Sequence, residues 1–228
     1  MTRFTRPGRF FRLPGADDPT PEHSDGRWMD RGRRIGITVH TLLYRVRVAG
    51  WARIPPTGPV LLVANHMNFM DGAVLFSVPT RRVSFLIKAE AVKGPLGWLL
   101  RNVGQYSIDR DVPSREVMLA ALAQLRAGGV IGLFPEGTRG DGNVEHVFSG
   151  AGWLAARSGA VVLPVALRGV QRPAGSRRRF RPTVSVLIGD PFPVPQGAGK
   201  VAVAAATDQV REKLAATVRE LDGLLAAR

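Results

Sequence analysis

The stretch PVLLVANHMNFMDG (residues 59–72) begins as a run of apolar residues and ends in polar ones. The run from Pro59 to Ala64 is typical of a buried strand. Asn65 and His66 follow at once, and ligands of α/β proteins gather beyond the carboxyl ends of the strands. Asp71 comes five residues after His66, at the predicted start of a helix. The stretch therefore predicts an α/β fold with a functional site at the end of this strand.

Short apolar runs alternate with helix-like windows along most of the chain. Strands are predicted near residues 47–49, 59–64, 83–87, 105–108, 130–134, 161–167 and 183–188, and helices near residues 71–78, 90–101, 114–127, 151–158 and 201–225. This alternation indicates a mostly parallel central sheet covered by helices on both faces. Because 228 residues with 45% apolar content form one full core, we expect a single globular domain, residues 47–228.

The composition limits the classes of partner. The formal net charge is +14, from 32 basic and 18 acidic residues, which favours nucleic acid, an anionic membrane surface or a phosphorylated substrate. The chain has no cysteine, which excludes disulfides, thiolate nucleophiles and cysteine-bound metal. Its longest apolar run is well short of the eighteen or so residues that span a bilayer.

Two segments precede the predicted domain. Residues 1–26 are basic and rich in proline and glycine, without the continuous apolar core of a secretory signal. They predict a disordered basic tail, with a transit peptide or a lipid contact as alternatives. Residues 27–46 place apolar side chains on one side of a predicted helix, namely Trp28, Ile35, Val39, Leu42 and Val46. This amphipathic helix either packs on the domain or lies on an anionic membrane surface.

His66 and Asp71 are the first candidate catalytic residues. Asp71 lies near enough along the chain to accept a hydrogen bond from the His66 ring. This bond would orient the imidazole and leave its other nitrogen free to act as a general base. A metal site formed with Glu136 is the competing interpretation, although one histidine and two carboxylates are a sparse ligand set.

A second group of polar residues follows another strand. GLFPEGTRG (residues 132–140) places Glu136, Gly137, Thr138 and Arg139 after an apolar run. Glycine permits a close approach of the backbone, and the planar guanidinium of arginine suits phosphate. An ordinary turn with a surface ion pair is the alternative for this motif taken alone.

Taken together, NHMNFMD (65–71) and FPEGTR (134–139) resemble the motifs of the glycerolipid acyltransferase family, which includes 1-acylglycerol-3-phosphate and glycerol-3-phosphate acyltransferases. The blocks KAEAVKGPLGWLLRNVGQYSIDRD (88–111) and VVLPVALRG (161–169) are also similar, so the resemblance covers roughly residues 45–169. It implies that His66 is the base and Asp71 its partner. It also implies an acceptor site made by Glu136, Gly137, Thr138 and Arg139, with Arg110 and Lys88 as further phosphate contacts.

One position departs from the family pattern. VFSG (147–150) stands where relatives often read FKxG, so Phe148 replaces a common lysine. Phosphate binding at this position would then depend on arginines alone.

The resemblance implies a peripheral enzyme at the cytoplasmic face of the cell membrane, without a cofactor or metal. It would transfer a fatty acyl group from coenzyme A or an acyl carrier protein to lysophosphatidate, making phosphatidate. The chain has no G-x-S-x-G elbow, so direct transfer is expected. Another lysolipid or glycerol 3-phosphate is the alternative acceptor. A non-catalytic lipid-surface or nucleic-acid binding protein, using the basic run 177–181, is the alternative of another class, although we expect no nucleic acid.

Overall fold

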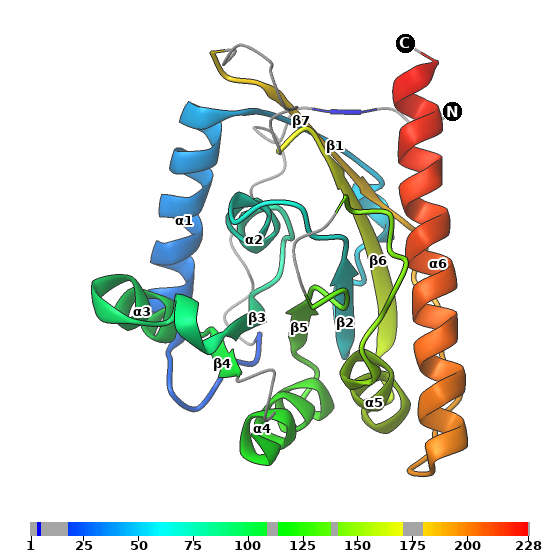
Figure 1. Ribbon diagram of the computed structural model, residues 1–228. Helices are drawn as coiled ribbons and strands as arrows, with labels where there is room; N and C mark the ends of the chain where they lie inside the picture. The colour runs from blue at the N-terminus through cyan, green and yellow to red at the C-terminus, as the bar shows by residue number, and fades with distance from the viewer. Residues whose placement is uncertain (1–3, 6–17, 109–113, 138–140, 171–179, 228) are drawn as a thin grey trace.

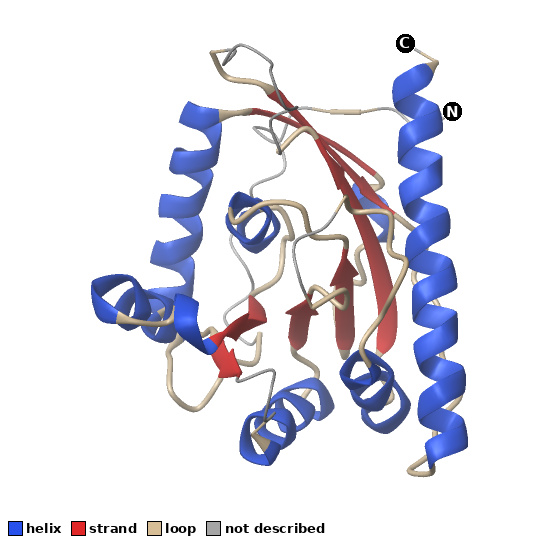
Figure 2. Cartoon of the chain, in the orientation of Figure 1, coloured by secondary structure: helices blue, strands red, loops and turns tan. Residues whose placement is uncertain are grey.

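The computed structural model describes residues 4–5, 18–108, 114–137, 141–170 and 180–227, which form one sheet with helices on both faces (Figures 1 and 2). The strands are β1 (Arg45–Ala49), β2 (Val60–Ala64), β3 (Val83–Lys88), β4 (Tyr106–Ile108), β5 (Val130–Leu133), β6 (Val161–Arg168) and β7 (Thr183–Ile188). The α-helices are α1 (Gly26–Leu43), α2 (Met70–Ser77), α3 (Gly94–Asn102), α4 (Arg115–Arg126), α5 (Ser149–Ser158) and α6 (Lys200–Ala226). Short 3₁₀ helices occupy Trp51–Arg53 and Ala89–Ala91.

The seven strands lie in the order β1-β7-β6-β2-β5-β3-β4. All neighbouring pairs are parallel except β6 and β7, which are antiparallel. The predicted fold class, a mostly parallel sheet flanked by helices, is confirmed. Because β2, β3 and β5 run in the same direction, the segments that follow them emerge at one edge of the sheet. This is the edge where α/β proteins bind ligands.

The sequence of β2 is apolar at every position because both faces of this strand are covered. Leu61 and Val63 pack into the cluster under α4, α5 and α6, whereas Val60 and Leu62 pack into the cluster that α2 covers. Successive side chains of a strand point to opposite faces, so a strand covered on both faces needs apolar residues at every position. Figure 1 shows α6 along one side of the molecule and α1 along the other.

The predicted helix over residues 27–46 ends earlier than expected, at Leu43. Arg45 and Val46 belong instead to β1, where they pair with Thr183 and Val184 of β7. Val46 fits the helical period of the preceding residues, so periodicity alone could not separate the two elements. Pairing with β7, a strand far along the chain, gives Arg45 and Val46 their extended conformation.

α1 packs on α2 through a face that its apolar stripe did not predict. Its buried residues are Met29, Arg33 and His40. Arg33 donates to the Pro79 carbonyl oxygen at 2.8 Å, and His40 Nδ1 lies 2.8 Å from Ser77 Oγ. Burial lowers the pKa of His40 to about 4. The structure therefore packs α1 on the domain and still leaves Ile35, Val39 and Leu42 of its apolar stripe exposed.

Part of the predicted N-terminal tail contacts the domain. The Asp18 carboxylate pairs with the buried Arg81 guanidinium at 2.9 Å and accepts the backbone N–H of Arg82 at 2.8 Å. The segment from residue 18 onward is thus held against the domain, while residues 1–3 and 6–17 of the predicted tail lie outside the described residues. The predicted basic run 177–181 also falls mostly outside them.

Candidate active site

The turn between β2 and α2 brings His66 and Asp71 together. His66 Nδ1 lies 3.1 Å from Asp71 Oδ2, and the Asp71 side chain is fully buried. The same oxygen accepts the backbone N–H groups of Met67 at 2.7 Å and Asn68 at 2.6 Å. Since these bonds fix the carboxylate on the turn, Asp71 holds the imidazole in one orientation and leaves Nε2 free for chemistry.

The second oxygen of Asp71 has a different environment. Asp71 Oδ1 is buried and has no hydrogen-bond partner among the described residues. A negative charge beside the ring would stabilise the imidazolium of a His66 that accepts a proton.

Glu136 links the two sequence motifs. Its Oε1 accepts the backbone N–H of His66 at 2.8 Å, and the carboxylate also accepts the backbone N–H of Val144. Burial raises the pKa of Glu136, and these two donors partly offset the rise. Glu136 therefore positions the backbone of His66, a role that the sequence did not indicate.

The segment 141–148 is clamped beside this link. Asn65 is fully buried; its Nδ2 donates to the carbonyl oxygens of Gly142 and Leu167, and its Oδ1 accepts the Leu167 N–H. Arg168 also donates to the Gly142 carbonyl oxygen, at 3.1 Å, and pairs with Asp222 of α6 at 2.7 Å. Asn65, which the sequence placed at the rim of the sheet, thus joins β2 to β6 and to this loop.

The His66 ring stacks on Phe134, which directly follows β5. The ring centroids are 4.1 Å apart with an interplanar angle of 22°, and Phe134 in turn stacks on Phe85. Aromatic packing of this kind restricts the orientation of the imidazole. Neither phenylalanine was singled out from the sequence, because an aromatic residue at a strand end is normally read as core.

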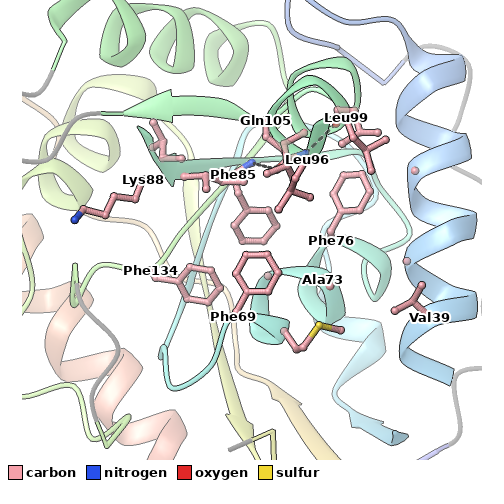
Figure 3. Close-up of a pocket in the computed structure, with 18 of the residues that line it drawn as sticks. Val39, Phe69, Ala73, Phe76, Phe85, Lys88, Leu96, Leu99, Gln105 and Phe134 are labelled. Carbon is pink, nitrogen blue, oxygen red and sulfur yellow. Dashed lines mark hydrogen bonds between the residues drawn. The ribbon is translucent and has the colours of Figure 1, made fainter. Parts of the chain in front are cut away.

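A largely apolar cavity of about 660 Å³ opens beside His66 (Figure 3). Its walls come from α1, α2, α3 and β3, and Figure 3 shows Phe69, Phe85 and Phe134 gathered around it with Leu96 and Leu99. The volume lies in the range of about 300–1,000 Å³ that is common for ligand sites. His66 and Lys88 are its only titratable lining residues in the part of the chain that the structure describes.

Of the residues predicted to bind the acceptor, some lie at the site and others lie outside the described residues. Gly137 has a φ of +72°, and an added Cβ would lie 2.1 Å from the Phe148 ring, so both the turn and this ring require glycine. Lys88 lines the cavity but is half exposed and pairs with Glu90 at 3.0 Å. Thr138, Arg139 and Arg110 lie outside the described residues. Within the described ranges, no group of three or more His, Asp or Glu side chains is arranged to hold a metal.

Residues 45–168 match the model of a protein family described as Acyltransferase. A lyso-ornithine lipid O-acyltransferase of Pseudomonas aeruginosa is 35% identical over 159 residues, which cover 68% of this chain and 58% of that protein. A 1-acyl-sn-glycerol-3-phosphate acyltransferase of Chlamydomonas reinhardtii is 32% identical over 172 residues, 71% of this chain and 51% of that protein. The chain thus spans little more than half the length of these two relatives.

A solved structure is also similar. The crystal structure of the 1-acyl-sn-glycerophosphate (LPA) acyltransferase from Thermotoga maritima matches with a TM-score of 0.67 and 27% sequence identity. The match covers 85% of this chain and 79% of the other.

Proposed function

Because this chain belongs to the acyltransferase family, we propose that it transfers a fatty acyl group from an acyl thioester to the free hydroxyl of 1-acylglycerol 3-phosphate, making phosphatidate. The observation that carries the proposal is the His66 imidazole, held by the buried Asp71 and opening into an apolar cavity. The proposed general base, His66, thus lies at the wall of a cavity that suits an aliphatic chain.

The proposed step is direct. His66 Nε2 takes the proton of the acceptor hydroxyl while that oxygen attacks the carbonyl carbon of the thioester. The C–S bond then breaks, the new ester forms, and the departing thiolate takes up the proton from the imidazolium. Asp71 carries no proton in this step; it orients the ring and stabilises its positive charge. Removing the base should cost about 10²- to 10⁴-fold in rate.

The apolar cavity suits the fatty chain of the donor. Its lining contains Ala73, Phe76 and Leu99, and Lys88 extends away from the gathered aromatic rings in Figure 3. A chain placed there would bury its methylene groups at about 0.8 kcal/mol each. Its carboxyl end would then lie at the His66 ring, where the reaction requires it.

Phe148, which replaces a lysine common in the family pattern, is a reason to test a second acceptor lipid. This ring is exposed and packs over Gly137, the place where the family pattern often supplies a lysine. The Pseudomonas relative is named for another acceptor, a lyso-ornithine lipid. Lyso-ornithine lipid is therefore the second acceptor to be tested.

The exposed face around the cavity supports a location at a membrane surface. Ile35 and Leu42 of α1 are 54% and 66% exposed, and Trp98 of α3 is 54% exposed. α1 and α3 lie at the same side of the molecule in Figure 1, and exposed basic residues flank them. None of the helices in the described ranges is long and apolar enough to cross a bilayer. We therefore place the protein on the bilayer surface, through apolar side chains and attraction to anionic headgroups.

An acceptor panel tests the proposal. Purified protein with a labelled acyl thioester should acylate lysophosphatidate, and His66→Ala should abolish transfer while the melting temperature stays close to that of the wild type. Glycerol 3-phosphate and lyso-ornithine lipid in the same panel identify the preferred acceptor. Transfer by His66→Ala at the rate of the wild type would refute the mechanism.

A further inference from the structure

A second cavity, also of about 660 Å³, lies between α4 and α5 and shares Leu86 and Phe134 with the first. The two cavities occupy opposite faces of the sheet. Phe85 and Phe134 pack toward the cluster that α2 covers, whereas Leu86 and Leu133 pack toward α4 and α5. The cavities therefore meet at the carboxyl ends of β3 and β5, beside the His66 ring that stacks on Phe134.

The second cavity has largely apolar walls and two lining arginines, Arg115 at the start of α4 and Arg157 near the end of α5. Arg157, near the end of α5, lines it; its guanidinium lies 5.2 Å from the Trp153 ring centroid and donates to the Ala198 carbonyl oxygen. Arg126 donates to the Arg157 carbonyl oxygen at 2.9 Å but does not line the cavity. None of these arginines forms an ion pair with another described residue, and the described lining contains no carboxylate.

We propose that this cavity binds the 4′-phosphopantetheine arm that carries the acyl thioester, with the phosphate of the arm at Arg157. The inference rests on the proposed acyl transfer and adds to it the binding site of the donor's carrier. A simple aliphatic chain fits the walls but would place its methyl end against the Arg157 guanidinium. An arm that is amphipathic along its length and anionic at its end complements both features.

The dimensions agree with this occupant. Between Ser149, beside the turn at Gly137, and Arg157, α5 rises about 12 Å at 1.5 Å per residue. From sulfur to phosphate the arm has about thirteen bonds, equivalent to about four extended residues or about 14 Å. An arm whose sulfur lies beside the turn at Gly137 would thus bring its phosphate to Arg157. The bond from the His66 N–H to Glu136 ties this turn to His66.

The start of α5 offers partners for the amide groups of the arm. No side chain caps this helix, and Ser149 and Gly150 of its first turn both line the cavity. Their N–H groups lack partners within the helix and suit the carbonyl oxygens of the arm. The exposed apolar face lies across the sheet on α1 and α3, so a water-soluble carrier would approach from the side away from the bilayer.

Two thioesters that differ only in the phosphate test the proposal. For the wild type, KM for acyl-phosphopantetheine should be about tenfold below KM for acyl-pantetheine, since the phosphate gains charge-assisted hydrogen bonds. Arg157→Gln should remove this difference by raising KM for the phosphorylated donor alone, and Arg157→Lys should restore most of it. Arg211→Gln, an exposed arginine of α6, is the control that should change neither.

A variant that fills the second cavity provides an independent measurement. An added Cβ at Gly150 would meet only Met118, at 3.7 Å, and Gly150 lines the cavity, so the Gly150→Leu side chain should extend into it. The melting temperature of this variant should stay close to that of the wild type. It should raise KM for acyl-coenzyme A and for acyl carrier protein donors, which share the arm, and leave KM for the lysolipid unchanged. Equal effects of Arg157→Gln on both small donors, or a rise in lysolipid KM alone with Gly150→Leu, would overturn the assignment. A wild-type protein inactive with every thioester would instead overturn the proposed function, and this inference with it.

Discussion

The backbone N–H of His66 donates to the carboxylate of Glu136 at 2.8 Å, across seventy residues of sequence. This bond ties the turn after β2 to the turn after β5, so the two motifs form one structure. Because the carboxylate accepts a second N–H from Val144, its replacement leaves two backbone donors unsatisfied. We therefore propose that Glu136 acts on the reaction through the position of His66.

Glu136→Ala should lower both stability and turnover. Each buried N–H without an acceptor costs about 1–3 kcal/mol, and displacement of the His66 backbone moves the base from its hydroxyl. We expect a reduced kcat with a small change in lysolipid KM. A variant in which lysolipid KM rises steeply while kcat is preserved would show that Glu136 binds the acceptor directly, as the family resemblance implies. Glu145→Ala, an exposed carboxylate of the neighbouring loop, is the matched control.

Asp71→Asn separates the charge of Asp71 from its hydrogen bonds. The amide oxygen can replace Oδ2 and keep the bonds to His66, Met67 and Asn68, while the amide nitrogen takes the place of the partnerless Oδ1. The fold should persist with a loss of about 1–3 kcal/mol for the buried amide. kcat/KM should fall about 100-fold or more, because the imidazolium loses its counter-charge. Activity near that of the wild type would show that orientation alone suffices.

The sequence predicted the strands and helices of this fold because a sheet covered on both faces requires continuous apolar strands, as at Val60 to Ala64. It also predicted the approach of His66 to Asp71, since both lie on one short turn. It could not predict the role of Asn65 or the clamp of Arg168, because their partners lie more than twenty residues away along the chain. The packing face of α1 was missed because Arg33 and His40 are polar residues that find buried partners only in the folded protein.

Ala73→Leu tests whether the first cavity holds the fatty chain. Ala73 lines the cavity from α2, so added methyl groups shorten the available space without changing His66. The preference measured with a series of donors should shift toward shorter acyl chains. Ala123→Leu, at an exposed position of α4, should leave the preference unchanged. An unaltered chain-length profile in Ala73→Leu, with turnover retained, would place the chain elsewhere.

The proposed membrane-binding face, formed by the exposed apolar residues of α1 and α3, is tested by adding charge to two of them. Leu42→Asp with Trp98→Asp should weaken sedimentation with anionic vesicles, because burial of both side chains and attraction to the headgroups are lost. Val201→Asp on α6 is a matched control, since Val201 is 85% exposed but lies away from α1 and α3. Increasing salt should release part of the bound wild type, as expected for the electrostatic contribution. Equal binding by all three proteins would exclude this face.

His40 should make the stability of the protein depend on pH. Burial lowers its pKa from 6.5 to about 4, so the unfolded chain binds a proton at a pH where the folded protein does not. The stability contributed by the neutral ring is complete above about pH 6.5 and is lost as the pH falls toward 4, at up to about 1.4 kcal/mol per unit. Chemical denaturation between pH 7 and 4 should show this decline. His40→Gln should reduce the slope, whereas His146→Gln, at an exposed position of a loop, should retain it; identical slopes in the two variants would mean that other groups cause the decline.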